Sequence, residues 1–277
     1  MKKNKLVQPF LKWAGGKRYI IESILKSKPK DFDIYYEPFL GAGAVLFEIQ
    51  PAKAIINDLN EELINTYLII KNNVENLIND LRKHKNDSDY YYKIRELDRH
   101  KSYKGLSDLE KASRIIYLNK TCYNGLFRVN SQGYFNVPFG KYTNPNILNE
   151  QVLRTVSEYL NYADISFLNK DFEESLKNID KGSFVYFDPP YDPISDSSSF
   201  TGYNLHGFKK EDQLRLKKSC DRLHSIGCNF LLSNSFTEFI LDLYKDYKIE
   251  IIKSNRTINS NASKRGEINE VLIKNYD

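Results

Sequence analysis

Four consecutive residues, Asp188, Pro189, Pro190 and Tyr191, carry groups suited to holding an amino group. They follow an apolar Phe-Val-Tyr-Phe run at residues 184–187 that favours a strand. Two successive prolines cannot continue a sheet ladder, because neither has an N–H to donate. We therefore expect a strand that ends in a rigid, extended turn. Its carboxylate, carbonyls and aromatic ring suit gripping a flat ring and accepting hydrogens from its exocyclic nitrogen. A plain proline turn explains the prolines, but neither the aspartate nor the tyrosine.

A second turn, at residues 39–43, contains Phe39, Gly41 and Gly43 and lies between a predicted strand and a predicted helix. Glycine there allows positive φ and lets a ligand approach the backbone closely, although a tight turn without a ligand explains the glycines as well. The third glycine of a dinucleotide fingerprint is absent, because Leu46 stands three residues after Gly43. The pattern therefore fits a dinucleotide poorly.

Asp58 ends the next predicted strand, fifteen residues after Gly43. In doubly wound folds an acid at this place accepts hydrogen bonds from ribose hydroxyls. Asp58 would equally serve as the N-cap of a helix that begins near Glu61, which needs no ligand. Taken with the glycine turn, it favours an adenosine-containing small molecule without the pyrophosphate reach of a dinucleotide.

The elements around these turns alternate between strand and helix, which predicts an α/β fold. We expect strands at 34–37, 54–58, 163–167, 184–187, 229–233, 249–252 and 270–273, and helices at 18–27, 44–49, 61–70 and 209–226. Between them, residues 74–85 and 106–118 are helical and charged, and the Asn-Ser-Gln-Gly run at 130–133 predicts a turn or hairpin. The sequence therefore predicts one α/β domain, residues 1–59 and 161–277, interrupted by an insert at residues 60–160.

Composition narrows the class of protein. Hydrophobic residues make up 41% of the 277 residues, which argues against disorder, and no stretch is apolar enough to span a membrane. Lys and Arg number 41 against 36 Asp and Glu, an excess compatible with a polyanionic partner but not diagnostic of one. The three cysteines form no C-x-x-C pair and the four histidines lack metal-ligand spacing, so we expect no metal site. An odd cysteine count without a signal peptide favours the cytoplasm.

Four motifs occur in a characteristic order along the chain. They are Lys-Trp-Ala-Gly-Gly-Lys at 12–17, Phe-x-Gly-x-Gly at 39–43, the Tyr-Asn-Gly-Leu-Phe-Arg-Val-Asn and Phe-Asn-Val-Pro-Phe-Gly runs at 123–130 and 135–140, and Asp-Pro-Pro-Tyr at 188–191. In this order they resemble the α-group DNA adenine-N6 methyltransferases of the Dam and DpnM type, the D12 class. The resemblance implies a Rossmann-like sheet that binds S-adenosylmethionine, with an inserted, mainly helical DNA-recognition domain carrying a hairpin.

The resemblance also implies which residues would bind the cofactor. Trp13 and Lys17 would contact it, the lysine at its carboxylate. The turn with Phe39, Gly41 and Gly43 would pack along its methionine end, Asp58 would take the ribose, and Asp171 and Phe172 would meet the adenine ring. Asp171 would equally cap a helix that starts near Glu173. No metal is implied.

The same resemblance implies the chemistry of the Asp-Pro-Pro-Tyr turn. The N6 amino group of adenine would donate to Asp188 and to the Pro189 carbonyl, which pulls the nitrogen towards tetrahedral geometry. Pro190 would complete the rigid turn, and Tyr191 would stack on a base that has left the duplex. The methyl group would then transfer in line, without a covalent enzyme intermediate.

The insert would read double-stranded DNA. Arg128 would bind a guanine at O6 and N7, and Asn124 and Leu126 would touch neighbouring bases. Tyr123 would wedge into the base stack. By the same resemblance, Pro138 would contact a base and Lys12 an outer base pair, and the target would be GATC.

Other functions remain open from the sequence. The enzyme would be a monomer or a dimer on DNA, and part of a restriction–modification pair, a phage system or a housekeeping system. A different target sequence, methylation of RNA or of protein glutamine, and a silent DNA-binding relative are alternatives. Glutamine enzymes more often carry Asn at the first turn position, and intact Asp188 and Tyr191 argue against loss of catalysis.

Overall fold

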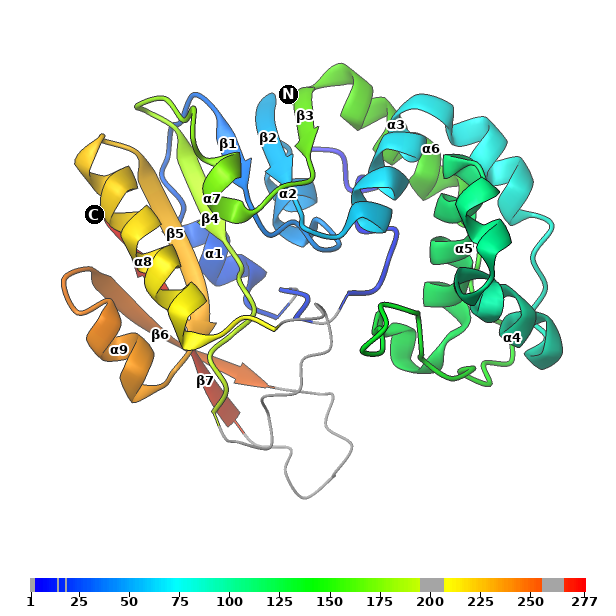
Figure 1. Cartoon of the computed structure of the whole chain (residues 1–277). Coiled ribbons are helices and arrows are strands. Elements are labelled where there is room, and N and C mark those ends of the chain that lie inside the picture. Colours follow the sequence, from blue (N-terminus) through cyan, green and yellow to red (C-terminus); the bar gives the residue numbers. More distant parts are fainter. Residues whose placement is uncertain (1–2, 14, 18, 195–206, 256–266) are drawn as a thin grey trace.

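The structure is a computed structural model of the chain and describes residues 3–13, 15–17, 19–194, 207–255 and 267–277 (Figure 1). Its centre is a seven-stranded sheet in the order β3-β2-β1-β4-β5-β7-β6. The strands are β1 (Tyr35–Glu37), β2 (Lys53–Asn57), β3 (Asp164–Leu168), β4 (Phe184–Phe187), β5 (Asn229–Ser235), β6 (Lys248–Asn255) and β7 (Glu267–Lys274). The first five are parallel, and β7 runs antiparallel between β5 and β6. The predicted Rossmann-like α/β fold is confirmed.

The strand order reverses between β1 and β4. From β1 the chain builds outwards through β2 to β3, and it then returns to β4 on the other side of β1. In open α/β sheets such a reversal leaves a crevice at the carboxyl ends of the two strands, where ligands bind. Because Tyr35 of β1 pairs with Phe184 of β4, the turns that follow these two strands meet at the reversal.

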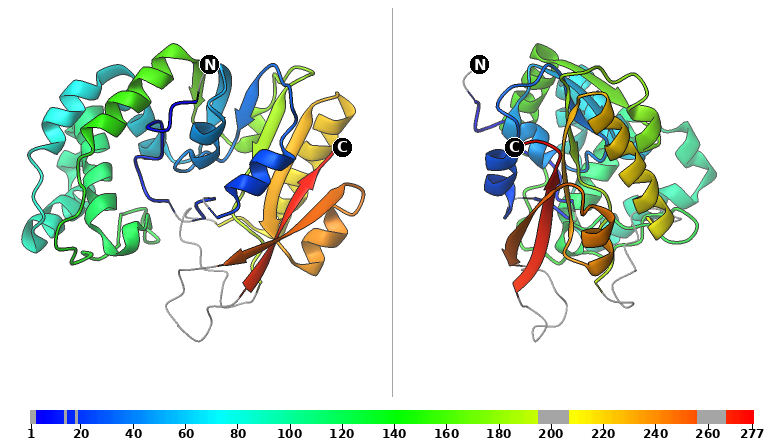
Figure 2. Two further views of the ribbon diagram at one scale, coloured as in Figure 1. Left: turned by 180° about the vertical axis from the view of Figure 1, so that it is seen from behind. Right: turned by 90° about the vertical axis from the view of Figure 1, so that its left-hand side faces the viewer.

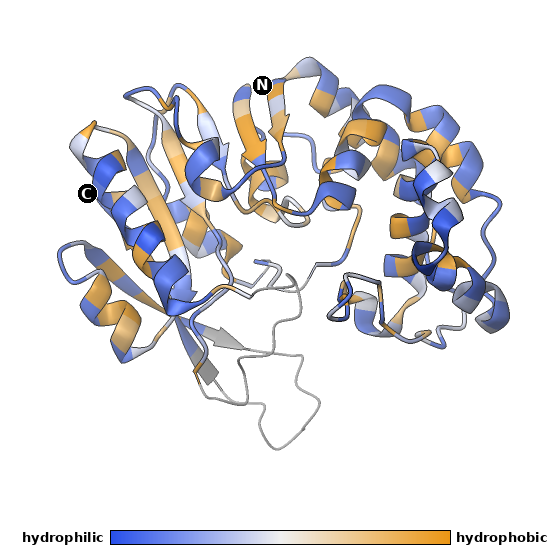
Figure 3. Ribbon diagram, in the orientation of Figure 1, coloured by the Kyte–Doolittle hydropathy of each residue, from blue (hydrophilic) through white to orange (hydrophobic). Residues whose placement is uncertain are grey.

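Helices cover both faces of the sheet, as the side view of Figure 2 shows. They are α1 (Ile21–Ser27) and α2 (Ala44–Ile49) on one face, and α7 (Phe172–Ser175), α8 (Lys210–Ser225) and α9 (Glu238–Leu243) on the other. Strand β4 explains the need for two layers: Phe184 and Tyr186 belong to the core beneath α1 and α2, whereas Val185 and Phe187 belong to the core beneath α8. A strand buried on both faces reads as a nearly continuous apolar run, and Figure 3 shows hydrophobic residues along several strands of the sheet.

The remaining helices gather beyond the β3 edge of the sheet (Figure 1). They are α3 (Glu61–Leu81), α4 (Ser88–Glu96), α5 (Asp108–Thr121) and α6 (Glu150–Tyr162), with short 3₁₀ turns η1 (Leu97–Arg99), η2 (Lys101–Gly105) and η3 (Tyr123–Gly125). Helix α3 packs against α5 and α6. Helical segments expected at 61–70 and 74–85 are one helix with a kink at Asn73. Ser107 and Glu110 form a capping box that starts α5.

A hairpin follows α5, as the Asn-Ser-Gln-Gly signal predicts. Val129 forms an antiparallel bridge with Phe135, and the Gly133 N–H donates to the Asn130 carbonyl over 2.9 Å. The hairpin is fixed to the helices through Asp98, whose Oδ2 accepts the Phe135 N–H at 2.8 Å. Asp98 also pairs with buried Arg114 of α5 at 2.8 Å. The hairpin therefore has a defined place on the helices.

Among the described residues, no helix is both long enough and apolar enough to cross a membrane.

Candidate active site

The Asp-Pro-Pro-Tyr turn (residues 188–191) directly follows β4, and the glycine turn (residues 39–43) follows β1 one residue after its end. Both therefore lie at the carboxyl edge where the strand order reverses. The fold brings together two motifs that lie far apart in the sequence. This edge is where an α/β sheet of this order binds small molecules.

Asp188 is held at the mouth of the sheet by two donors. Lys17 Nζ lies 2.7 Å from its Oδ1, and the Ser233 hydroxyl donates to the same oxygen over 3.2 Å. Ser233 Oγ also lies 3.0 Å from the Tyr186 hydroxyl. Burial raises the pKa of Asp188, and the positive charge of Lys17 opposes the rise. Burial and the Lys17 charge thus act in opposite directions on the pKa of the Asp188 carboxyl.

The Lys17 ammonium occupies the space between the carboxylate and the aromatic ring of the turn. Its side chain is only 3% exposed, and it donates to the Gly15 carbonyl over 2.6 Å. It also lies 4.6 Å from the ring centroid of Tyr191, a cation–π distance. The sequence predicts Lys17 at the cofactor carboxylate, and that role stays a prediction. Here the ammonium is bound by Asp188 and Tyr191 as an amino group would be.

The ring of Tyr191 is fixed at its hydroxyl as well as at its face. The hydroxyl donates to Glu270 Oε2 on β7 over 2.9 Å. The other carboxylate oxygen, Oε1, accepts the Tyr19 hydroxyl at 3.0 Å. Burial, with the negative charges of Asp188 and Glu270, raises the pKa of Tyr191 well above its usual value. The phenol therefore stays protonated and remains a donor.

The backbone of the turn is tied to α8 and β5. Gln213 donates from Nε2 to the Pro190 carbonyl over 3.1 Å, and its Oε1 accepts the Asn234 side-chain amide at 3.2 Å. Asn234 Oδ1 in turn accepts the N–H of Asp192 at 3.0 Å. Gln213 and Asn234 are both buried. Since buried amides need partners, this chain of bonds fixes the turn in one conformation.

Asp58 supports the glycine turn from the end of β2. Its Oδ2 accepts the Gly41 N–H and its Oδ1 the Asn60 N–H, each at 2.9 Å. Burial raises the pKa of Asp58, and these backbone donors oppose the rise. The alternative that Asp58 is an N-cap is wrong, because Asn60 caps α3 by accepting the Leu63 N–H. The acid lies beside the glycine backbone, and its contact with a ribose stays a prediction.

Gly43 has φ of +69°, and a Cβ there would lie 2.8 Å from the Tyr67 hydroxyl oxygen. Gly41 has φ of +53°, and a Cβ there would lie 3.0 Å from Cδ1 of Trp13. Both positions thus require glycine for conformation and for space. The indole of Trp13 also stacks on Phe127 at 4.8 Å, with 19° between the ring planes. Trp13 therefore joins the glycine turn to the segment that leads into the hairpin.

Asp171 and Phe172 lie at the start of α7. Asp171 accepts the Glu173 N–H at 3.0 Å and pairs with Arg215 at 2.8 Å. The capping alternative for Asp171 is therefore confirmed, and contact with an adenine ring stays a prediction. Phe172 is buried and packs 5.4 Å from Phe39 of the glycine turn. The aromatic residue is thus next to the predicted cofactor turn.

The predicted DNA-contacting residues gather on the hairpin segment (residues 123–142). Tyr123, Asn124, Arg128 and Pro138 are exposed, Leu126 is half-buried, and buried Phe127, Phe135 and Val137 alternate with them. Arg128 donates to the Asn136 side chain over 2.7 Å, and the Tyr123 N–H donates to the Pro138 carbonyl over 2.8 Å. The segment thus presents polar and aromatic side chains on an apolar base.

Lys12 connects the amino-terminal segment to this surface. Asn119 of α5 accepts the Lys12 N–H at 2.8 Å and donates to its carbonyl over 2.7 Å. The Lys12 ammonium lies 5.3 Å from the Tyr142 ring centroid. A Cβ on Gly125, where φ is +63°, would lie 2.4 Å from Lys12 Cδ, so the two segments are in close contact.

Comparison with known proteins identifies the family. The sequence model of the D12 class N6 adenine-specific DNA methyltransferases matches residues 13–258. The chain belongs to this class.

Relatives resemble the methyltransferase along its whole length. It is 44% identical to the Type II methyltransferase M1.LlaDCHI of Lactococcus lactis subsp. cremoris, over 100% of this chain and 98% of the relative. It is 41% identical to the Type II methyltransferase M.MjaIII of Methanocaldococcus jannaschii, over 98% and 99% of the two chains. It is 33% identical to the DNA adenine methylase of Escherichia coli, over 98% and 95%. The protein is thus an adenine-specific DNA methyltransferase, and its class implies S-adenosylmethionine as methyl donor and DNA as substrate.

Several residues of the site in the methyltransferase were missed from the sequence. Tyr19, Gln213, Ser233 and Glu270 all contact the Asp-Pro-Pro-Tyr turn or its partners. A signal for Ser233 was present, because Ser-Asn-Ser at 233–235 is a polar run at the carboxyl end of an otherwise apolar strand. The other three, Tyr19, Gln213 and Glu270, have no chemical signature that their immediate neighbours in sequence would reveal.

The methyltransferase has free, buried cysteines at 122, 220 and 228. Burial raises the pKa of the Cys122 thiol to about 12, so it carries little thiolate at neutral pH. In the described ranges, no three His, Cys, Asp or Glu side chains form a group that would hold a metal ion.

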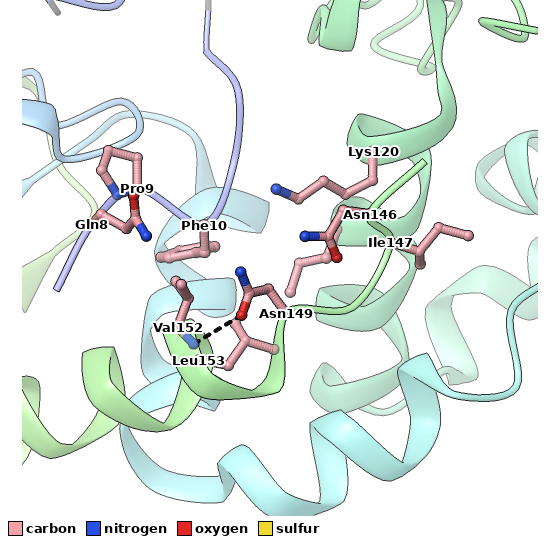
Figure 4. Close-up of a pocket in the computed structure, with 10 residues that line it drawn as sticks. Gln8, Pro9, Phe10, Lys120, Asn146, Ile147, Asn149, Val152 and Leu153 are labelled. Atoms are coloured by element: carbon pink, nitrogen blue, oxygen red, sulfur yellow. Dashed lines mark hydrogen bonds between the residues drawn. The ribbon is translucent and has the colours of Figure 1, made fainter. Parts of the chain in front are cut away.

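A cavity of about 180 Å³ lies between the amino-terminal segment, α5 and α6 (Figure 4). It is enclosed by the amino-terminal segment with Gln8, Pro9 and Phe10, by Ile116 and Lys120 of α5, by Asn146, Ile147 and Asn149, and by Val152 and Leu153 of α6. No predicted site residue lines it. It therefore shares no lining residue with the two turns.

Proposed function

We propose that the enzyme transfers the methyl group of S-adenosylmethionine to N6 of adenine in GATC sites of duplex DNA, after the adenine has left the duplex. One observation carries this proposal: a buried ammonium, that of Lys17, lies between the Asp188 carboxylate and the Tyr191 ring. A carboxylate acceptor and an aromatic face, set around an N–H donor, are what an adenine with its exocyclic amino group requires.

The target amino group takes the place of the Lys17 ammonium. When adenine enters, N6 donates to Asp188 and to the Pro189 carbonyl, and the base stacks on Tyr191. These bonds draw the nitrogen lone pair out of conjugation, and the carboxylate stabilises positive charge that develops on N6. Lys17 then turns to the cofactor carboxylate. Asp188 must be ionised, and the excess N6 proton leaves through it after transfer.

The residues around the glycine turn suit the cofactor. S-adenosylmethionine, when bound, supplies an electrophilic methyl group on its sulfonium. We propose that it is held by Trp13, Lys17, Phe39, Gly41, Gly43, Asp58, Asp171 and Phe172. The fit is supported by the tight turn that Gly41 and Gly43 make with positive φ at the carboxyl end of β1, and by Asp58 beside its backbone. Holding both reactants in line is then the main contribution to the rate.

The base must leave the duplex because the site is recessed. The Lys17 side chain is 3% exposed, Tyr191 is half-buried, and Glu270 behind them is 1% exposed. An adenine stacked between its neighbours cannot reach such a site, so enzymes of this kind extrude it. Tyr123, which is 52% exposed, is suited to fill the gap left in the stack.

The hairpin segment is suited to read the bases. Arg128 offers a guanidinium that matches the O6 and N7 acceptors of guanine, and Asn124 and Leu126 lie close to it in sequence. Lys12 and Pro138 complete the contacts. Arg128 donates to Asn136 over 2.7 Å in the protein alone, so it is oriented before DNA arrives. GATC is the target that this set of residues favours.

We propose the following organisation. Residues 1–59 and 161–277 form the catalytic domain, and residues 60–160 the target-recognition domain. The enzyme is a monomer, or a dimer on DNA, and acts in the cytoplasm. Two of the relatives are named Type II methyltransferases, which supports a restriction–modification system. We propose that its endonuclease makes no direct contact with this enzyme.

The test is transfer of labelled methyl groups to duplexes that contain GATC or a scrambled site of equal composition. Incorporation only into GATC duplexes supports the proposal, incorporation into both refutes the site assignment, and incorporation into neither refutes the activity. In cells that express the protein, genomic DNA should be cut by a nuclease that requires GATC methylation. The same DNA should resist a nuclease that is blocked by GATC methylation.

Variants separate chemistry from recognition. Asp188→Ala should abolish transfer while DNA binding persists. Its control is Asp164→Ala, which removes an exposed carboxylate from β3. Arg128→Ala should reduce discrimination between GATC and the scrambled site, whereas Arg154→Ala should not, because Glu75 and Glu150 already neutralise Arg154.

A further inference from the structure

Glu270 joins three segments that meet behind the methyl-transfer site. It stands on β7, which pairs with β5 on one side and β6 on the other. Its Oε2 accepts the hydroxyl of Tyr191 at 2.9 Å, and its Oε1 accepts that of Tyr19 at 3.0 Å. The side chain is 1% exposed. A buried carboxylate with both oxygens engaged, on a strand inside a sheet, has little freedom to move.

The two contacts of the Tyr191 ring differ in permanence. Lys17 lies against the ring face, 4.6 Å from its centroid, and must leave when a base takes that position. Glu270 holds the hydroxyl at the edge of the ring, where a stacked base does not compete. When the face contact is exchanged, the bond to Glu270 remains and helps to keep the ring in place.

We propose that Glu270 is a positioning residue that holds Tyr191 as a fixed stacking surface for the target adenine, with Tyr19 fixing the orientation of the Glu270 carboxylate. This inference rests on the proposed function, because it assumes that the base stacks on Tyr191. Glu270 does not touch the base. It acts through the Tyr191 hydroxyl, and it keeps N6 within reach of Asp188 by limiting rotation of the ring on which the base lies.

Two other roles for Glu270 predict different results. A structural role, in which the acid only joins β7 to its neighbours, would change stability and leave turnover of the folded enzyme intact. An electrostatic role would act through Asp188, since the charge of Glu270 contributes to the raised pKa of that carboxyl. That role needs the carboxylate, but not the hydroxyl of Tyr191.

The experiment compares Glu270→Gln, Tyr191→Phe, the double variant and Tyr19→Phe in the full-length enzyme. Tyr191→Phe keeps the stacking ring and removes only the hydroxyl. Glu250→Gln is the control, because Glu250 on β6 is an exposed acid that accepts the Ser27 hydroxyl at 3.1 Å. Three quantities are measured: single-turnover methylation of a GATC duplex, its dissociation constant, and the emission of 2-aminopurine placed at the target adenine.

Glu270→Gln and Tyr191→Phe should each slow the single-turnover rate by about tenfold to a hundredfold, the range for a hydrogen bond to a charged acceptor. The double variant should match the slower single variant within about twofold, since both remove the same bond. Tyr19→Phe should lose about threefold. Bound 2-aminopurine should become brighter in Glu270→Gln and Tyr191→Phe, because a mobile ring quenches it less, while the dissociation constants change little.

Other outcomes overturn the proposal. Wild-type rates in Tyr191→Phe would refute it even if Glu270→Gln were slow, and so would losses that multiply in the double variant. An acid limb of the pH–rate profile that moves to lower pH only in Glu270→Gln, with a wild-type rate in Tyr191→Phe, would assign the electrostatic role instead. If Glu270→Gln does not fold, the two tyrosine variants still decide. Failure of the proposed function would be separate, because the wild-type enzyme itself would then be inactive on GATC.

Discussion

The ion pair between Lys17 and Asp188 gives the sharpest test of the site in the free enzyme. Lys17→Met removes the ammonium and keeps the length of the side chain. Breaking a fully buried pair costs about 3–5 kcal/mol. The Asp188 side chain is 22% exposed and keeps the Ser233 hydroxyl, so we expect a loss of about 2 kcal/mol in the free energy of unfolding.

The loss should depend on pH, and its direction follows from the raised pKa of Asp188. Between the ordinary value of 3.8 and the raised value, the folded state binds more protons than the unfolded state, so stability falls as pH rises. Without Lys17 the pKa of Asp188 rises further, and this window becomes wider. The deficit of Lys17→Met should therefore be small at acid pH and grow towards neutral pH.

Urea denaturation at a series of pH values measures this deficit. Lys217→Met is the control: Lys217 Nζ also lies 2.7 Å from a carboxylate, that of Asp221, but the Asp221 side chain is 49% exposed, and such a pair contributes about 0.3–0.5 kcal/mol. A double-mutant cycle with Asp188→Asn should give a coupling free energy above about 1 kcal/mol. No coupling, or a deficit equal to that of Lys217→Met at every pH, would refute the buried pair.

Three further predictions concern other parts of the fold. Gly43→Ala should lower the free energy of unfolding by about 1–3 kcal/mol, because its φ is +69° and a Cβ would lie 2.8 Å from the Tyr67 hydroxyl. Gly105→Ala, with no atom within 4 Å of the added Cβ, should not. Burial lowers the pKa of His84 from 6.5 to about 4, so folding stability should fall as pH drops through this range, and His84→Gln should flatten that slope. Asp58→Asn should weaken binding of S-adenosylmethionine about tenfold by calorimetry, with little change in the rate at saturation.

The sequence predicts most of the fold because the strands and turns carry local signals. The apolar run at residues 184–187 is buried on both faces as β4, and proline ends it where the turn begins. The sequence predicts two helical segments, 61–70 and 74–85, on either side of residues 71–73. In the structure both segments contribute to α3, but Asn73 between them has non-helical φ and ψ, so the expected break is present as a kink.

The site was predictable where its chemistry lies within one motif. Asp188 and Tyr191 follow one strand, so their types and order indicate a grip on an amino group. Glu270 lies 79 residues beyond Tyr191, on a strand whose sequence predicts only burial, and its role depends on which strands become neighbours. The motif at residues 12–17 places Lys17 in the site, but its pairing with Asp188 depends on the conformation of the lysine side chain in the folded protein. Such pairings are set by tertiary structure and have no local signal.

Buried and exposed side chains alternate along the hairpin segment, so selection for folding and selection for surface contacts act on different residues of the same stretch. Phe127, Phe135 and Val137 form its apolar base, whereas Arg128 and Pro138 reach solvent. Exchange of an exposed side chain of this segment leaves its buried apolar residues unchanged, and also the Asp-Pro-Pro-Tyr turn and the glycine turn. Under the role in target recognition that we propose for these side chains, new target preferences can therefore evolve by single substitutions, without a period in which the enzyme is unfolded or inactive.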